Sequence, residues 1–436
     1  MSKRLFYLSV CLFWIVCGGC GKNTEDDVQV DLEKKDIVIL EEQKIIENIY
    51  HQNNSSATKR VRSIMYTQSE SGDEQELFKL VHISDPHISG YSIDNKHHSP
   101  INFIHSIRFA NQINLRINAI AVTGDLIGFS KEKINAIGYI DSFVTHFRKN
   151  NRIPSVVCIG NHDNNYLMDP LLDIFVIPRD ELNTCLFTND PFRKGSDKKE
   201  NYYYLDVPNP QGGVIRLISL DMIDHAGTVY DALHQAYYSQ KQIDWLGNIA
   251  LKERMTEQHS IVILNHFPFE PKRSAKEHSY LSDGLFVHSW QMIPEIIEAF
   301  RSKTTIQKRY PNMVNQSASP ISVNYDFSDN EGEFICHLGG HAHCFACFEL
   351  KELENENPLL PKQRMILCSN QSPTESVGIY NKTVRKNKHI SSNNFNIYTF
   401  DTSNKTIHLT FFGANTFMSD ASLPEIISFP YLYSDY

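Results

Sequence analysis

The sequence lacks any block or stripe of positive charge. Its 42 Lys and Arg residues are outnumbered by 51 Asp and Glu residues, and the net charge of -9 is spread along the chain. Proteins bind duplex nucleic acid through clustered Lys and Arg side chains that neutralise its phosphates. We therefore expect no duplex nucleic acid as a partner. The hydrophobic content of 41% predicts a globular chain with a large core.

The sequence also lacks a cysteine framework. Three of its nine cysteines fall in the first 20 residues, and the other six are scattered without regular spacing. A chain of this length does not need disulfide bonds to hold a small core together, so we predict no essential disulfide. Cys344 and Cys347 form a C-x-x-C pair without a second pair to complete a zinc site, which favours core packing.

The N-terminus lacks an apolar run long enough to cross a membrane. Leu5–Val16 follows Lys3 and Arg4, and its twelve residues would span about 18 Å as a helix. The hydrocarbon core of a bilayer is roughly 30 Å thick. A short apolar run behind two positive charges is typical of a signal peptide.

The residues after this run resemble the cleavage box of bacterial lipoproteins. Gly18 and Gly19 precede Cys20, although Cys17 stands where such boxes have an aliphatic residue. We expect lipidation of Cys20 and export to the bacterial cell envelope, facing the periplasm or the surface; secretion without an anchor is the alternative. The predicted boundaries are a signal peptide at 1–19, the lipidated Cys and a polar tether at 20–75, and one domain at 76–436.

After residue 76, short apolar runs rich in β-branched residues alternate with helical patterns. Six runs are predicted to be buried strands, namely Phe78–Ile83, Ala119–Thr123, Val156–Ile159, Val214–Leu220, Ile261–Leu264 and Phe334–Leu338. Strands that alternate with helices imply a parallel sheet with right-handed crossovers.

Two helices are predicted between the first three strands. Ser99-Pro100 is expected to start the first, and Ser130 to cap the second. The apolar face of the second helix is predicted to consist of Ile134, Ile137, Ile140, Val144 and Phe147.

Polar residues of the kinds that bind metals directly follow five of these strands. They are Asp85 and His87, Gly124-Asp125, Gly160-Asn161-His162-Asp163, His266, and Gly340-His341-Ala342-His343. The carboxyl ends of strands in an open α/β sheet line one crevice, so these groups are expected to converge. Each block alone has an ordinary explanation, as a turn or a core histidine. Five blocks in order, each at a strand end, indicate one site.

Together, these five blocks resemble the signature of the calcineurin-like metallophosphoesterases over residues 78–345. The resemblance implies an α/β fold in which two mixed β-sheets pack face to face with helices on the outer faces, a four-layer arrangement. It also implies closing strands at Phe395–Phe400 and Thr406–Phe412. Gly128 departs from the pattern, since many members have an Asp there.

The resemblance further implies a pair of metal ions. One would be held by Asp85, His87, Asp125 and His343, and the other by Asp125, Asn161, His266 and His341, with Asp125 bridging. Imidazole and carboxylate ligands suit divalent or trivalent Mn, Fe or Zn. The extra carboxylate of the first set would favour the harder or more oxidised ion.

The implied activity is that of a metal-dependent phosphoesterase, which hydrolyses a small phosphate monoester or diester with a hydroxide held between the ions. His162 is expected to bind the phosphoryl oxygens or protonate the leaving group, with Asp163 orienting it; alternatively, His162 is itself a ligand. The competing functions are a surface-exposed binding lipoprotein with a retained but inactive metal site, and a metal-storage protein.

No motif identifies the residues that select the substrate. Candidates in long segments near the site are Tyr166, Lys198, Lys199, Tyr202–Tyr204 and the stretch 270–332, all of which could equally be ordinary surface. His97 and His98 are expected to be solvated. The sequence determines neither the natural substrate nor the oligomeric state.

Overall fold

The structure of the protein is a computed structural model. It describes residues 44, 48, 50, 54–68, 72–89, 100–166, 175–188, 190–193, 200–224, 235–270, 286–287, 289–311, 319–350, 363–371, 392–413 and 426–431. The chain divides into two units, residues 1–44 and 45–436, and the description below concerns the second. Several residues singled out from the sequence lie outside the described residues, namely the signal peptide, Cys20, His97, His98, Lys198 and Lys199.

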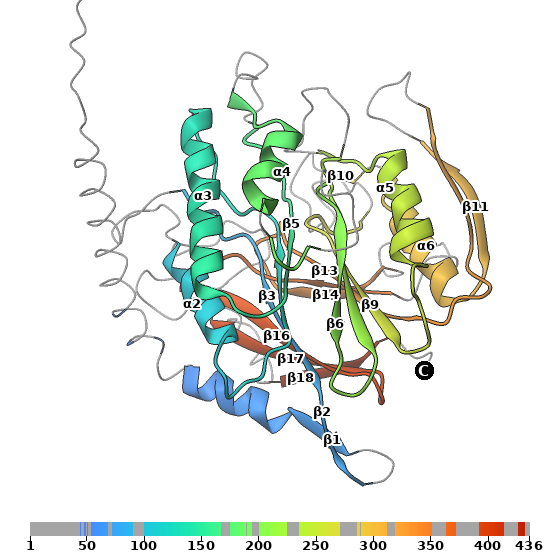
Figure 1. The fold of residues 1–436 in the computed structure, drawn as a ribbon, viewed down its shortest axis with the longest axis horizontal. Coiled ribbons are helices and arrows are strands. Elements are labelled where there is room, and N and C mark those ends of the chain that lie inside the picture. Colours follow the sequence, from blue (N-terminus) through green and yellow to red (C-terminus); the bar gives the residue numbers. More distant parts are fainter. Residues whose placement is uncertain are drawn as a thin grey trace, which may run out of the picture. The chain divides into compact units, whose positions relative to one another are not determined.

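Two six-stranded sheets form the centre of the fold (Figure 1). The first has the order β18-β17-β16-β3-β4-β5 and consists of β3 (Phe78–Ile83), β4 (Ala119–Thr123), β5 (Ser155–Cys158), β16 (Asn394–Asp401), β17 (Thr406–Gly413) and β18 (Ile426–Pro430). The second has the order β14-β15-β13-β9-β7-β6 and consists of β6 (Tyr203–Pro208), β7 (Val214–Ser219), β9 (His259–Leu264), β13 (Glu333–Gly339), β14 (Ala346–Glu349) and β15 (Arg364–Leu367). The six strands predicted from apolar runs are confirmed, with ends that agree to within two residues.

Both sheets are mixed. β3, β4 and β5 run parallel, with Leu80 opposite Ala119 and Ile120 opposite Ser155, whereas β16, β17 and β18 pair antiparallel. In the second sheet β7, β9, β13 and β15 run parallel, and the edge strands β6 and β14 are antiparallel. The sheets pack against each other, since the Val157 amide of β5 donates to the Tyr203 hydroxyl of β6 at 2.8 Å. Every residue of β3, β4 and β5 is buried as a result.

Helices cover the outer faces of this pair of sheets. They are α2 (Ile101–Ala110), α3 (Lys133–Asn150), α4 (Arg179–Phe187), α5 (Gln240–Trp245), which runs on into the π-helix η2 (Leu246–Ala250), and α6 (Met292–Arg301). Figure 1 shows α2 and α3 on one side of the sheets and α5 and α6 on the other. The predicted fold class, two mixed sheets with helices outside, is confirmed. No helix among the described residues is long and apolar enough to cross a membrane.

Short two-stranded pairings complete the fold. They are β1 (Tyr66–Gln68) with β2 (Glu74–Glu76), β8 (Gln235–Ala236) with β10 (Phe286–Val287), and β11 (Thr305–Tyr310) with β12 (Ile321–Asp326). The long segment 270–332 thus supplies α6 and the β11–β12 hairpin in its described part.

The predicted start of α3 is wrong, whereas its predicted apolar face is confirmed except at Ile134. The helix begins at Lys133 with Glu132 as its N-cap, while the Ser130 hydroxyl accepts the Glu132 amide at 3.2 Å in the preceding turn. Ile134 is 70% exposed. The buried stripe is Ala136, Ile140, Phe143 and Phe147, which lie three or four residues apart on one helical face.

The predicted tether extends too far toward the domain. Residues 54–63 are helical, and Tyr50, Ala57, Val61 and Met65 belong to the hydrophobic core. The Tyr50 hydroxyl also donates to Asn102 Oδ1 of α2 at 3.1 Å. The polar composition of this segment concealed an apolar stripe, so Tyr50 and residues 54–68 are part of the folded unit.

Tyr202–Tyr204 are likewise core residues and line no substrate surface. All three are less than 9% exposed, and Tyr202 packs on Trp245 with ring centroids 4.9 Å apart. Cys344 is buried and Cys347 half-buried, which agrees with core packing for the C-x-x-C pair.

Candidate metal centre

The predicted metal-binding residues emerge from the carboxyl ends of five strands in two sheets. Asp85 and His87 follow β3, Asp125 follows β4 and Asn161 follows β5, and these three strands are parallel neighbours. His266 follows β9, and His341 and His343 follow its parallel neighbour β13. The site therefore lies where the carboxyl ends of both sheets meet, and all seven residues contribute to it.

The first group of side chains is called here the Asp85 cluster and consists of Asp85, His87, Asp125 and His343. One ligand atom from each lies within 4.8 Å of all the others. His87 Nε2 is 3.1 Å from His343 Nε2, and His343 Nε2 is 3.4 Å from Asp85 Oδ1. Two nitrogens each about 2.1 Å from one ion, at roughly a right angle, stand about 3 Å apart. The cluster therefore fits a transition-metal ion.

The second group is called the Asn161 cluster and consists of Asp125, Asn161, His266 and His341. Asn161 Oδ1 lies 3.0 Å from His266 Nε2 and 3.1 Å from His341 Nδ1. His266 Nε2 is 3.2 Å from Asp125 Oδ1. Two imidazole nitrogens, a carboxylate and an amide oxygen converge on one point, which also fits a transition-metal ion.

Asp125 belongs to both clusters. Its Oδ2 is 3.5 Å from His87 Nε2, and its Oδ1 faces His266. Burial alone would raise the pKa of the Asp125 carboxyl, but the neighbouring His162 and His266 lower it well below its ordinary value. The pKa of Asp85 is similarly lowered to about 2 against the effect of burial, by His266 and His343. Both side chains are thus carboxylates that attract cations.

The backbone of the site is strained. Five of the seven candidate ligands have positive φ angles, Asp85 (50°), His87 (44°), Asp125 (50°), His341 (68°) and His343 (52°). Such conformations are uncommon outside glycine and cost on the order of 1–3 kcal/mol each. Their concentration at one site indicates that the surrounding fold holds these side chains in place for a function.

Two glycines allow the loops to approach one another. A Cβ at Gly160 would lie 2.3 Å from Asp125 Oδ1, and one at Gly340 would lie 1.8 Å from Ser84 Oγ. Both distances are far below van der Waals contact. Any side chain at Gly160 would therefore displace the Asp125 carboxylate, and any side chain at Gly340 would displace Ser84, the residue before Asp85.

Neighbouring groups orient the ligand rings. His266 Nδ1 lies 2.6 Å from the Thr123 carbonyl oxygen, which can only accept, so Nδ1 carries a proton and Nε2 faces the cluster. His343 Nδ1 contacts the side-chain amide of Asn370 at 3.3 Å. The backbone amide of Gln371 donates to the backbone carbonyl of Asp85 at 3.3 Å. Outer partners of this kind typically hold metal-binding histidines in register.

Asn370 and Gln371 were missed in the sequence. They follow β15, whose apolar run Met365–Leu367 lies directly beside β13. The strand-end rule that located the candidate ligands would also have pointed to these two neighbours, had this short run been recognised as a strand.

His162 lies beside the clusters without belonging to either of them. Its ring stacks on Phe129 with centroids 3.9 Å apart, and its Nε2 is 3.7 Å from Asp125 Oδ2, too far for a hydrogen bond. Its backbone amide donates to Asp125 Oδ1 at 2.9 Å. Burial lowers the pKa of the imidazole, and Asp125 opposes this effect.

The predicted role of Asp163 in orienting the His162 ring is wrong. The Asp163 carboxylate accepts the backbone amides of Leu126 at 2.7 Å, Ile127 at 3.2 Å and Gly160 at 2.7 Å. Burial and the nearby Asp125 raise its pKa to about 8, against the effect of these amide donors. Asp163 therefore ties the Asp125 loop to the Asn161 loop and acts on the metal ligands through the backbone.

Comparison with known proteins assigns the sequence to a family. Residues 78–301, more than half of the chain, match the family described as calcineurin-like phosphoesterase. No curated protein matches the sequence significantly. The solved structure of a dimetal phosphatase from Danio rerio is similar, with 12% identity, 81% of this chain and 99% of that chain covered, and a TM-score of 0.44.

A protein from Thermus thermophilus also shows similarity, with 12% identity, 58% of this chain and 91% of that chain covered, and a TM-score of 0.27. Both TM-scores are below 0.5, so the assignment rests on the sequence match and not on these two structures. The chain belongs to the calcineurin-like phosphoesterase family.

Proposed function

We propose that this protein is a dinuclear-metal hydrolase of small phosphate esters. The observation that carries the proposal is the pair of adjacent donor clusters that share Asp125, with one carboxylate oxygen facing each. A bound pair of cations would lower the pKa of a water molecule toward about 7 and offset charge on the phosphoryl oxygens. The donor set of imidazoles, carboxylates and an amide oxygen suits Mn, Fe or Zn.

His162 is proposed to act on the substrate. Its side chain is 23% exposed, whereas that of Asp125 is 1% exposed, so the imidazole can be reached from solvent. Its Nε2 points toward the shared carboxylate without bonding to it. From this position Nε2 could donate a proton to the departing oxygen or a hydrogen bond to a phosphoryl oxygen. Stacking on Phe129 limits the ring to one orientation and so favours a positioned donor.

Export and lipid anchoring remain proposals that rest on the sequence. They are supported by the short apolar run Leu5–Val16 behind two positive charges and by the Gly-Gly-Cys box that ends at Cys20. A phosphoesterase held at the cell envelope would act on phosphate esters outside the cytoplasm.

The proposed activity is tested by screening purified protein against aryl phosphomonoesters and phosphodiesters. Chelator-treated protein should be inactive, and Mn²⁺, Zn²⁺ or Fe should restore turnover. The preferred ester class would then distinguish a monoesterase from a diesterase. Tight binding of two ions per chain without turnover of either class would instead favour the binding lipoprotein with an inactive metal site.

A further inference from the structure

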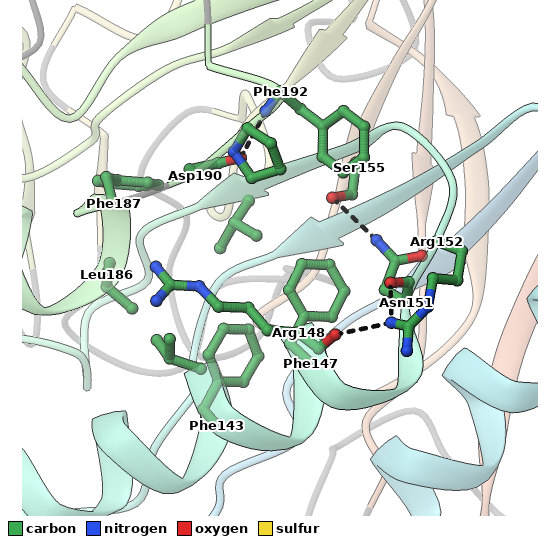
Figure 2. Close-up of a pocket in the computed structure, with 13 residues that line it drawn as sticks. Phe143, Phe147, Arg148, Asn151, Arg152, Ser155, Leu186, Phe187, Asp190 and Phe192 are labelled. Carbon is green, nitrogen blue, oxygen red and sulfur yellow. Dashed lines mark hydrogen bonds between the residues drawn. The ribbon is translucent and has the colours of Figure 1, made fainter.

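A cavity of about 390 Å³ lies away from the metal-binding loops, between α3, the start of β5 and α4. It is called here the α3–α4 pocket. Figure 2 shows Phe143, Phe147, Leu186, Phe187 and Phe192 around it. Its volume falls within the range of roughly 300–1,000 Å³ that small-molecule sites occupy. Ser155 at the amino end of β5 lines it, whereas Asn161 of the metal centre follows the other end of that strand.

The apolar wall of the pocket is rigid. Phe143 stacks on Phe103 of α2 at 4.8 Å and on Phe147 at 5.7 Å. On the opposite wall Phe187 packs edge-on against Tyr203 at 5.5 Å, and the Arg193 guanidinium lies 4.6 Å from the Phe187 ring centroid. Side chains held from behind in this way cannot collapse into the cavity. The wall is therefore preorganised for an apolar group, which lowers the entropic cost of binding.

The polar part of the wall is positively charged. Arg148 donates to the Thr188 carbonyl, and Arg152 Nη1 donates to the carbonyls of Arg148 at 3.0 Å and Asn151 at 2.8 Å. Neither guanidinium has a carboxylate of the described residues within ion-pair distance, although Arg148 attracts Asp190 at longer range. Asp190 is the single acidic residue of the wall, and its Oδ1 accepts the Phe192 amide at 2.9 Å. Two arginines against one carboxylate leave a net charge of about +1.

We propose that the α3–α4 pocket binds a small carboxylate with an apolar tail. The tail would replace water against the phenylalanine rings, and the carboxylate would pair with Arg148 or Arg152, whose planar guanidinium groups suit it. A neutral apolar molecule would not gain this pairing. A doubly charged anion would exceed the net charge of the wall.

Isothermal titration of the full-length, metal-loaded protein with decanoate tests this proposal. Saturating inorganic phosphate is included so that the carboxylate does not bind the metal centre. We expect binding of one decanoate per chain. Each CH₂ removed from the tail should weaken binding about fourfold, and 1-decanol should bind at least about tenfold more weakly than decanoate.

Variants locate the ligand. Val144→Trp, on the pocket face of α3, should abolish binding, whereas the matched Ile134→Trp on the exposed face of the same helix should leave it unchanged. Arg148→Gln and Arg152→Gln should each reduce the preference for decanoate over decanol. These two polar substitutions test the pocket even where Val144→Trp does not fold, as judged by its thermal melt.

Three results would overturn the proposal. They are the absence of saturable binding to the wild type, full binding by a folded Val144→Trp variant, and equal affinity for decanoate and decanol. None of them bears on phosphoesterase activity, so the pocket and the metal centre are tested separately.

Discussion

The two donor clusters share a carboxylate but differ in charge. The Asp85 cluster has two carboxylates, Asp85 and Asp125, whereas the Asn161 cluster has Asp125 and a neutral amide. In exposure the two clusters are alike, since each has one half-buried histidine, His343 in the first and His341 in the second. Because of its extra carboxylate, the Asp85 cluster should hold the harder ion more tightly. One bridging residue thus joins two sites of unequal charge.

The largest effect is expected from Asp125→Asn, which removes the charge common to both clusters. Loss of an outer partner alone typically costs 10–100-fold in metal affinity, so loss of the shared ligand should exceed about 100-fold at both sites. Elemental analysis should find fewer than one ion per chain and turnover should be abolished. The exposed Asp141→Asn on α3 is the matched control. Retention of two ions would contradict the bridging role.

Single-cluster ligands should separate the two sites. His87→Ala is expected to empty chiefly the Asp85 cluster, and His266→Ala the Asn161 cluster, because each imidazole faces one group only. Each variant should retain about one ion per chain and lose most turnover. Loss of both ions from His87→Ala would show that the clusters do not fill independently.

His162→Ala should leave both clusters filled and alter the chemistry. Turnover of alkyl phosphates should fall by about 10²–10⁴ if His162 protonates the leaving oxygen, whereas nitrophenyl esters, whose anion departs without a proton, should lose less. The check is a steeper dependence of rate on leaving-group pKa. Equal losses on both esters would point to stabilisation of phosphoryl charge, and loss of an ion would make His162 a ligand.

A smaller effect, confined to the Asp85 cluster, is expected from Asn370→Ala, which removes the group beside His343 Nδ1. Metal affinity should fall about 10–100-fold at the Asp85 cluster and stay unchanged at the Asn161 cluster. Titration of the metal-free protein with Mn²⁺ gives both affinities. Asn370→Asp places a carboxylate oxygen there, which can accept the Nδ1 proton of a His343 that binds metal through Nε2, and should restore much of the loss; weakening of both sites alike would indicate a general structural role.

No effect on either cluster is expected from Cys20→Ala. The wild type should carry an acyl chain by mass spectrometry and sediment with membranes, whereas the variant should be released with unchanged metal content and turnover. A variant that stays with the membranes, together with an unmodified wild type, would rule out the lipid anchor.

Much of the fold was predictable because its signals are local. β-Branched runs predicted β3, β4 and β9, and Phe395–Phe400 was expected to be a closing strand, now part of β16. The face of α3 was predicted except at Ile134, which continues the apolar spacing but is exposed. The contact of Phe143 with Phe103 of α2 joins two helices and could not be predicted from the spacing in either.

The sequence by itself determined which residue types stand at the strand ends, and hence the seven candidate ligands and the family. The family resemblance implied how they are grouped, but only the tertiary structure gave their spacing, because the distances between His87 and His343 or between Asn161 and His266 depend on how two sheets meet. It also decided that Asp163 ties loops together and that Tyr50 belongs to the core. Contacts between residues far apart in the chain arise from packing and register, which local patterns do not specify.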